Sequence, residues 1–136
     1  MKLSTKGRYG LLSLGHLVSA YPEKTVSLSE IAESEGLSVS YLEQLFRTLK
    51  KSGIVESSRG AHGGYRLSKN PVEITIYDAL SSLEGTPVLS CRTVGDLPCR
   101  TEGLCSQSCR TEKLLDLLQG EVDRIFSSHT LWELGL

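Results

Sequence analysis

The chain has 136 residues, of which 39% are hydrophobic and 23% charged, and this balance excludes both a disordered chain and a membrane-spanning one. Its net charge of −1 hides an asymmetry, because residues 1–69 carry ten Lys or Arg against six Asp or Glu, whereas residues 70–136 carry five against ten. The basic half suits contact with a polyanion, although chance variation in surface charge accounts for it equally well. The first eight residues lack the apolar core of a signal peptide, so we expect a cytoplasmic protein without a membrane partner.

The first predicted helix covers about residues 4–20. An apolar stripe recurs along it at three- and four-residue steps and consists of Leu11, Leu14, Leu17 and Val18. The start of this helix carries Lys2, Lys6 and Arg8, and cations are unfavourable near a helix N-terminus. Either solvent or a nearby phosphate group compensates these charges.

Two further helices follow in a helix-turn-helix arrangement. Ser27 and Glu30 form an S-x-x-E capping box at the start of the second helix, and Gly36 is a natural cap at its end. The third helix follows Ser38 directly and ends near Gly53. Two short helices joined by a tight turn that contains glycine are typical of a helix-turn-helix.

The third helix separates its residues onto two faces. The apolar face consists of Val39, Leu42, Leu45, Phe46 and Leu49. The opposite face carries groups that can hydrogen-bond to base edges or phosphates, namely Ser40, Glu43, Gln44, Arg47, Lys50 and Lys51. A polar face is usually only a solvated face, but its position in the second helix of the motif favours a recognition helix.

A β-hairpin is predicted directly after the third helix. Residues 54–58 and 65–67 are typical strands, and residues 59–64 form a glycine-rich turn between them. Arg59, Gly60 and His62 lie at its tip and form a cationic finger suited to the minor groove or to phosphates. The turn lacks the lysine-containing ending of a nucleotide-binding loop, so we interpret the hairpin as a wing.

All four cysteines of the chain fall within nineteen residues. A fourth helix is predicted at 75–84, and the segment 86–109 that follows has no sustained periodicity and contains Cys91, Cys99, Cys105 and Cys109. In a cytosolic protein such a cluster indicates metal binding or redox chemistry rather than a disulfide scaffold. Thiolates suit iron–sulfur clusters and zinc, but the C-x-x-C pairs of many zinc sites and thiol oxidoreductases are absent. A thiol switch without metal is an alternative, and an enzyme is not expected.

The last predicted helix covers about residues 111–127. Its apolar arc spans about 180°, more than the stripe that one contact surface requires. We therefore expect it to pack against its own domain and against a second copy of the chain, through Leu114, Leu118, Val122 and Ile125. Residues 130–134 are expected to form a short docking tail anchored by Trp132, and His129 has no evident partner.

Four stretches of the sequence resemble the Rrf-type family of bacterial winged-helix regulators. They are the opening MKLSTKGRYG, residues 40–45, residues 59–65 and residues 83–85. The resemblance covers nearly the whole chain and implies a homodimer with crossing C-terminal helices and recognition helices in successive major grooves. It assigns base readout to Ser40, Glu43 and Gln44, with Tyr41 and Arg47 nearby and Arg59 in the wing.

Within that family, the cysteine segment is similar to that of the iron–sulfur cluster regulators. The resemblance implies that Cys91, Cys99 and Cys105 hold a [2Fe–2S] cluster. The spacing here is C-x7-C-x5-C-x3-C, and Ser108 stands where those regulators have a histidine. The fourth ligand is therefore open among Cys109, a residue of the partner subunit and a weak oxygen ligand.

The sequence thus predicts a mainly α fold with a small β-hairpin wing. We expect a winged helix-turn-helix domain at 1–70, a connecting helix and cysteine-bearing sensor segment at 71–110, and a dimerisation helix with its tail at 111–136. The implied function is a cluster-sensing regulator, mostly a repressor, of iron–sulfur cluster biogenesis genes, bound to a double-stranded, pseudo-palindromic DNA operator. Regulators of the same fold that respond to nitric oxide, thiol redox state or cysteine metabolism are the alternatives, with zinc or no metal in place of the cluster.

Overall fold

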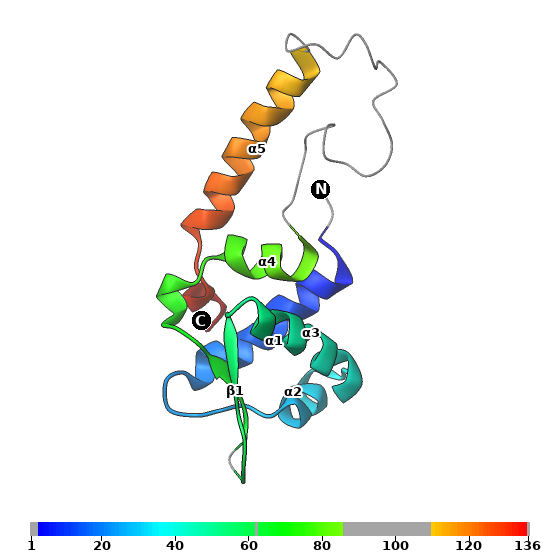
Figure 1. The fold of residues 1–136 in the computed structure, drawn as a ribbon, viewed down its shortest axis with the longest axis vertical. Helices are drawn as coiled ribbons and strands as arrows, with labels where there is room; N and C mark the ends of the chain where they lie inside the picture. Colours follow the sequence, from blue (N-terminus) through cyan, green and yellow to red (C-terminus); the bar gives the residue numbers. More distant parts are fainter. Residues whose placement is uncertain (1–2, 62, 86–109, 136) are drawn as a thin grey trace.

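The computed structural model describes residues 3–61, 63–85 and 110–135 (Figure 1). The helices and strands follow the chain in this order: α1 (Thr5–Ala20), α2 (Leu28–Glu35), α3 (Val39–Lys51), β1 (Val55–Ser58), β2 (Gly64–Leu67), the 3-10 turn η1 (Pro71–Glu73), α4 (Ile76–Glu84), α5 (Arg110–Ser128) and the 3-10 turn η2 (Leu131–Gly135). The mainly helical fold with one two-stranded antiparallel sheet, expected from the sequence, is confirmed.

Helix α1 is the central element of the core. Ser4 caps its N-terminus by accepting a hydrogen bond from the Gly7 amide at 3.2 Å. The stripe predicted for this helix is buried at Leu14, Leu17 and Val18 and half-buried at Leu11. Helix α4 crosses α1 so closely that a Cβ atom on Gly10 would lie 2.2 Å from a methyl carbon of Leu83. Glycine therefore permits this contact between helices.

Helices α2 and α3 form the predicted helix-turn-helix. Both hydrogen bonds of the capping box are present, from the Ser27 amide to the Glu30 carboxylate at 2.8 Å and from the Glu30 amide to the Ser27 hydroxyl at 3.2 Å. Gly36 ends α2 with φ of +67°, a left-handed conformation that glycine adopts without steric cost. The turn that separates the two helices therefore follows from local sequence.

The apolar face of α3 packs into the core almost as predicted. Its buried residues are Leu42, Leu45, Phe46 and Leu49. Val39 was expected on the same face but is 39% exposed at the first residue of α3, where the helix begins.

The β-hairpin follows α3 and is tied to it. Val55 pairs with Leu67 at the base and Ser58 with Gly64 near the tip, so the loop comprises residues 59–63. The ammonium group of Lys50 donates a 2.6 Å hydrogen bond to the hydroxyl of Ser57 and links the end of α3 to β1. The hairpin extends from the body as a narrow projection (Figure 1).

Helix α5 leaves the body of the molecule and contacts it through α4 (Figure 1). The predicted tail then returns as η2, which packs against α1. Leu131 is completely buried in the core, and its amide donates to the carbonyl of Ile74 at 2.9 Å. The expectation that Trp132 anchors the tail is wrong, since this side chain is 53% exposed while its neighbour occupies the buried position.

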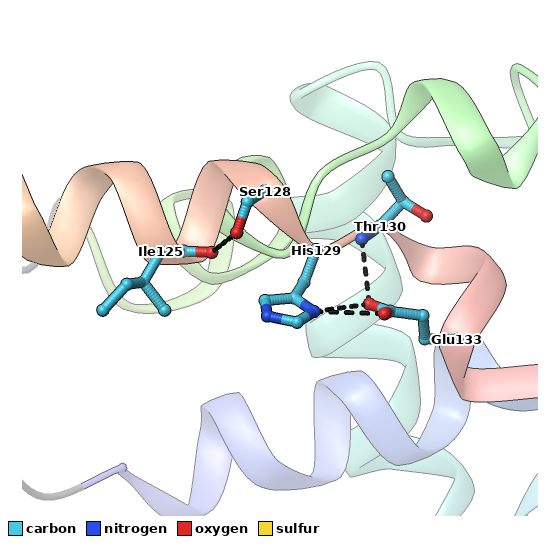
Figure 2. A network of polar contacts seen from close by, with 5 residues as sticks. All are labelled: Ile125, Ser128, His129, Thr130 and Glu133. Carbon is cyan, nitrogen blue, oxygen red and sulfur yellow. Dashed lines mark hydrogen bonds and ion pairs between the residues drawn. The ribbon is translucent and has the colours of Figure 1, made fainter.

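A small polar network marks the point where α5 gives way to η2. His129 Nδ1 lies 2.9 Å from the Glu133 carboxylate, which also accepts a hydrogen bond from the Thr130 amide at 3.3 Å (Figure 2). His129 thus has a partner that the sequence did not reveal. The Ser128 hydroxyl bonds to the carbonyl of Ile125 at 2.7 Å and closes the last turn of α5.

Candidate functional site

The outward side of α3 presents the three polar residues expected to read bases, together with Arg47. Ser40, Glu43, Gln44 and Arg47 are all exposed. Within the described residues no salt bridge is formed by Glu43 or Arg47, and no hydrogen bond is formed by the side chain of Gln44. The donors and acceptors on this surface are therefore available to an external ligand.

Tyr41 has a different environment from its neighbours on α3. Its side chain is half-buried, and its ring meets that of Tyr9 edge to face, with centroids 6.2 Å apart and planes at 89°. An edge-to-face aromatic pair favours one relative placement of the two rings. The contact therefore fixes the start of α3 against α1 and orients the exposed side of the recognition helix.

The wing carries two of its three expected contact residues within the described chain. Arg59 and Gly60 are exposed, and Gly60 has φ of +110°, a conformation that disfavours other residues. A hydrogen bond of 2.9 Å from the Gly63 amide to the Gly60 carbonyl closes the loop. His62 lies outside the described residues.

The start of strand β2 in the wing is held against the helical body. Val26 and Tyr65 exchange backbone hydrogen bonds of 2.9 and 2.8 Å, which join the segment before α2 to β2. A Cβ atom on Gly64 would lie 2.6 Å from the Val26 carbonyl oxygen, so the glycine permits this approach. The direction of the wing relative to the helix-turn-helix is therefore determined by backbone contacts.

The cysteine segment lies between the end of α4 and the start of α5. Cys91, Cys99, Cys105 and Cys109 are all outside the described residues. Elsewhere in the described chain, no group of three or more His, Cys, Asp or Glu side chains is arranged to hold a metal ion.

Helix α5 exposes a row of apolar side chains. Leu114 is 55%, Leu118 42% and Ile125 51% exposed, whereas Val122 is half-buried. Leu117, at 65% exposure, extends the row and was not among the residues singled out for dimerisation, although its place in the apolar arc could have indicated it. None of the helices in the described ranges is both long and apolar enough to cross a membrane.

Comparison with known protein families identifies the family to which this chain belongs. Residues 3–135 match the model of the family Rrf2, described as an iron-dependent transcriptional regulator. The chain belongs to the Rrf2 family. The recognition from sequence motifs is thereby confirmed over almost the whole chain.

Two kinds of Rrf2 relative are similar to this chain. It is 48% identical over 85 residues to the HTH-type transcriptional regulator CymR of Bacillus subtilis, a match that covers 62% of each protein. It is 35% identical over 135 residues to the regulator IscR of Vibrio campbellii, a match that covers 98% of this chain and 77% of the relative. The matched part thus spans less than two thirds of CymR and more than three quarters of IscR.

Solved structures of both kinds share the fold. The structure of CymR (YrzC), the global cysteine regulator of B. subtilis, matches with a TM-score of 0.74 and 35% identity and covers 99% of this chain and 96% of that one. The T. potens IscR structure matches with a TM-score of 0.71 and 36% identity over 96% of this chain and 83% of that one. The winged-helix Rrf2 architecture is therefore confirmed, while the two relatives differ in name and offer two hypotheses for the effector.

Proposed function

We propose that this Rrf2 protein is a homodimeric, DNA-binding transcription regulator that senses an iron–sulfur cluster and acts mostly as a repressor of iron–sulfur cluster biogenesis genes. The observation that carries the DNA-binding part is the exposed polar side of α3 beside the glycine-tipped wing. The observation that carries the sensing part is the confinement of all four cysteines to one segment between α4 and α5.

Sequence readout is assigned to the exposed side of α3. Gln44 has the donor and acceptor that pair with adenine in the major groove, and Glu43 can accept a hydrogen bond from the amino group of cytosine. Ser40 and Arg47 can bind base edges or backbone phosphates. Tyr41 positions the helix through its ring contact with Tyr9.

The wing adds a contact outside the major groove. Arg59 and Gly60 are exposed at its tip, where a cationic side chain suits the minor groove or the phosphates that flank it. His62 completes this set in the sequence. The hairpin contacts α3 through β1, so a single docking orientation serves both elements.

A homodimer would cover the apolar side of α5. Leu114, Leu118 and Ile125 are each at least 42% exposed on a helix that extends away from the body. A row of large apolar side chains in water is costly and is typical of an interaction surface. Val122, the fourth residue of the predicted set, is half-buried.

The donor set of the cysteine segment fits a [2Fe–2S] cluster. Cys91, Cys99 and Cys105 would supply three thiolates, and Cys109 is the first choice for the fourth ligand. When bound, the cluster would supply a redox-responsive group between α4 and α5. The described residues offer no competing metal site, so loading would depend on these thiols.

The test is a measurement of iron, acid-labile sulfide and zinc per chain on anaerobically purified protein, with its visible spectrum. Near-equal iron and sulfide, with visible absorption lost in Cys99→Ala, supports the cluster. A duplex selected from a random library should then be bound differently before and after chelation. Zinc alone, or no metal, contradicts cluster sensing. The DNA-binding part is then tested by whether the chain selects a duplex from the random library.

The second candidate is a regulator of cysteine metabolism. It is favoured by the 48% identity over 85 residues to CymR and by the high coverage of the CymR structure. This candidate predicts that the purified chain contains no iron or sulfide. It also predicts that replacement of all four cysteines by serine leaves binding to the selected duplex unchanged. Loss of the cluster signal and of operator choice in the same variant contradicts it.

A further inference from the structure

A hollow separates the start of α1 from the exposed side of α3. Its volume is about 400 Å³. Lys6 in the first turn of α1 forms one wall, and Tyr41, Gln44, Leu45, Arg47 and Thr48 of α3 form the other. Lys6 and Arg47 are distant in the sequence, and the packing of the two helices brings them to the same cavity.

We propose that this hollow binds a backbone phosphate of the operator, held by Lys6 together with Arg47. The inference rests on the proposed DNA-binding function and adds Lys6, which the base-reading residues do not include. The role of this phosphate site is to position the recognition helix on the duplex, because phosphate contacts set register and orientation without reading sequence.

The charge of the cavity favours an anion. Two cationic side chains line it and no carboxylate does. Lys6 and Arg47 are both exposed, and neither forms a salt bridge or a side-chain hydrogen bond within the part of the chain that the structure describes. Their donors are therefore free to bind an external phosphate.

The remaining lining groups restrict where the anion sits. Leu45 is buried and forms an apolar floor. The hydroxyl of Thr48 donates to the Gln44 carbonyl at 3.2 Å, so its proton is not available to a ligand. The donors that remain are the two cations and the polar groups of Tyr41 and Gln44, which belong to the side of α3 that faces DNA in the proposed function.

The cavity walls are held at a defined separation. Tyr9 on α1 and Tyr41 on α3 meet edge to face with ring centroids 6.2 Å apart. Tyr9 follows Lys6 by about one helical turn, and Tyr41 precedes Arg47 by nearly two. A rigid site reduces the entropy lost when the phosphate is clamped. The helix positions that carry Lys6 and Arg47 are thus held at a defined separation.

The test compares Lys6→Gln with wild type on two duplexes, one selected from a random library by the wild-type chain and one of scrambled sequence. Affinity is measured by fluorescence anisotropy between about 50 and 200 mM salt. We expect the affinity for both duplexes to fall by about threefold to tenfold. The slope of log affinity against log salt concentration should become shallower by about one for each bound protomer. Lys6→Arg should retain most of the affinity.

Two controls separate this result from misfolding and from general loss of charge. Removal of a cation near the N-terminus of a helix does not destabilise it, so the thermal midpoint of Lys6→Gln should equal or exceed that of wild type. Lys113→Gln, the same change on α5, should leave affinity and salt dependence unchanged.

The outcomes distinguish the two levels of the hypothesis. Unchanged affinity and salt dependence in Lys6→Gln, or a loss confined to one base position of the selected duplex, overturns the phosphate site and leaves DNA binding standing. Failure of the wild-type chain to select any duplex overturns the proposed function and the phosphate site together.

Discussion

Glu84, the last residue of α4, caps the start of α1 through Ser4. Its Oε1 accepts a hydrogen bond from the Ser4 amide at 2.9 Å and a second one from the Ser4 hydroxyl. Glu84 immediately precedes Gly85 and the segment that carries the cysteines. The contact therefore joins the residue that precedes that segment to the N-terminal end of α1, where Lys6 lies.

Replacement of Glu84 tests how much this contact contributes to stability. Glu84→Ala should lower the free energy of unfolding by about 1 kcal/mol, because the acceptor of both hydrogen bonds is lost from an exposed site. Glu84→Gln, which keeps an acceptor oxygen, should cost less. Glu73→Ala is the control, since Glu73 is exposed on η1. Urea denaturation measures all three, and equal losses in the two alanine variants would exclude a special role for Glu84.

The glycine at the crossing of α1 and α4 should tolerate no side chain. Gly10→Ala places a Cβ 2.2 Å from Leu83, a buried residue, and should destabilise the protein by about 1–3 kcal/mol. Gly120→Ala on α5, where nothing lies within 4 Å, should stabilise the helix by up to about 1 kcal/mol. The midpoint of thermal unfolding should therefore fall in Gly10→Ala and rise in Gly120→Ala. A neutral Gly10→Ala would contradict the close crossing.

The tail should depend on one of two adjacent side chains. Leu131 is completely buried, and Leu131→Ala should cost about 2–5 kcal/mol through lost burial and the cavity left behind. Trp132 is 53% exposed, so Trp132→Ala should cost less than about 1 kcal/mol. Chemical denaturation measures the free energy of unfolding that each variant loses. A larger loss in Trp132→Ala than in Leu131→Ala would show that the tryptophan anchors the tail.

Base readout by Glu43 predicts a change of specificity rather than of overall affinity. Glu43→Ala should relax discrimination at one base pair by about 1–3 kcal/mol, because the carboxylate no longer accepts from a single base. Single-position substitutions in the selected duplex measure the effect. Glu33→Ala, the same change of charge on exposed α2, should leave the base preference unchanged. An unaltered profile in Glu43→Ala would remove this residue from readout.

The apolar row on α5 predicts the oligomeric state. Leu118→Glu should shift the protein from dimer to monomer in sedimentation velocity, because a charge would be buried at the interface without a partner. Its secondary structure should be retained, since Leu118 is 42% exposed in the single chain. Ser127→Glu, at an exposed position near the end of the same helix, should remain dimeric. A dimer that withstands Leu118→Glu would place the interface elsewhere.

Local sequence patterns account for most of the secondary structure and for the character of the recognition surface. The capping residues Ser27 and Glu30, the turn glycine Gly36 and the two faces of α3 are all determined within a few residues of chain, so periodicity and capping chemistry were sufficient to predict them. The exposed polar residues of α3 and the wing follow from the same patterns. Their roles in binding are proposals that such patterns support.

Only the tertiary structure decided which residues meet across the fold. A helical pattern identifies an apolar side chain but not whether another element covers it, and so Leu131 rather than Trp132 enters the core and Val39 is left exposed. The bond between Glu84 and Ser4 and the shared cavity of Lys6 and Arg47 join residues far apart in the chain. Such contacts depend on how α1, α3 and α4 cross, and a crossing is set by the packing of all three helices together rather than by the sequence of any one.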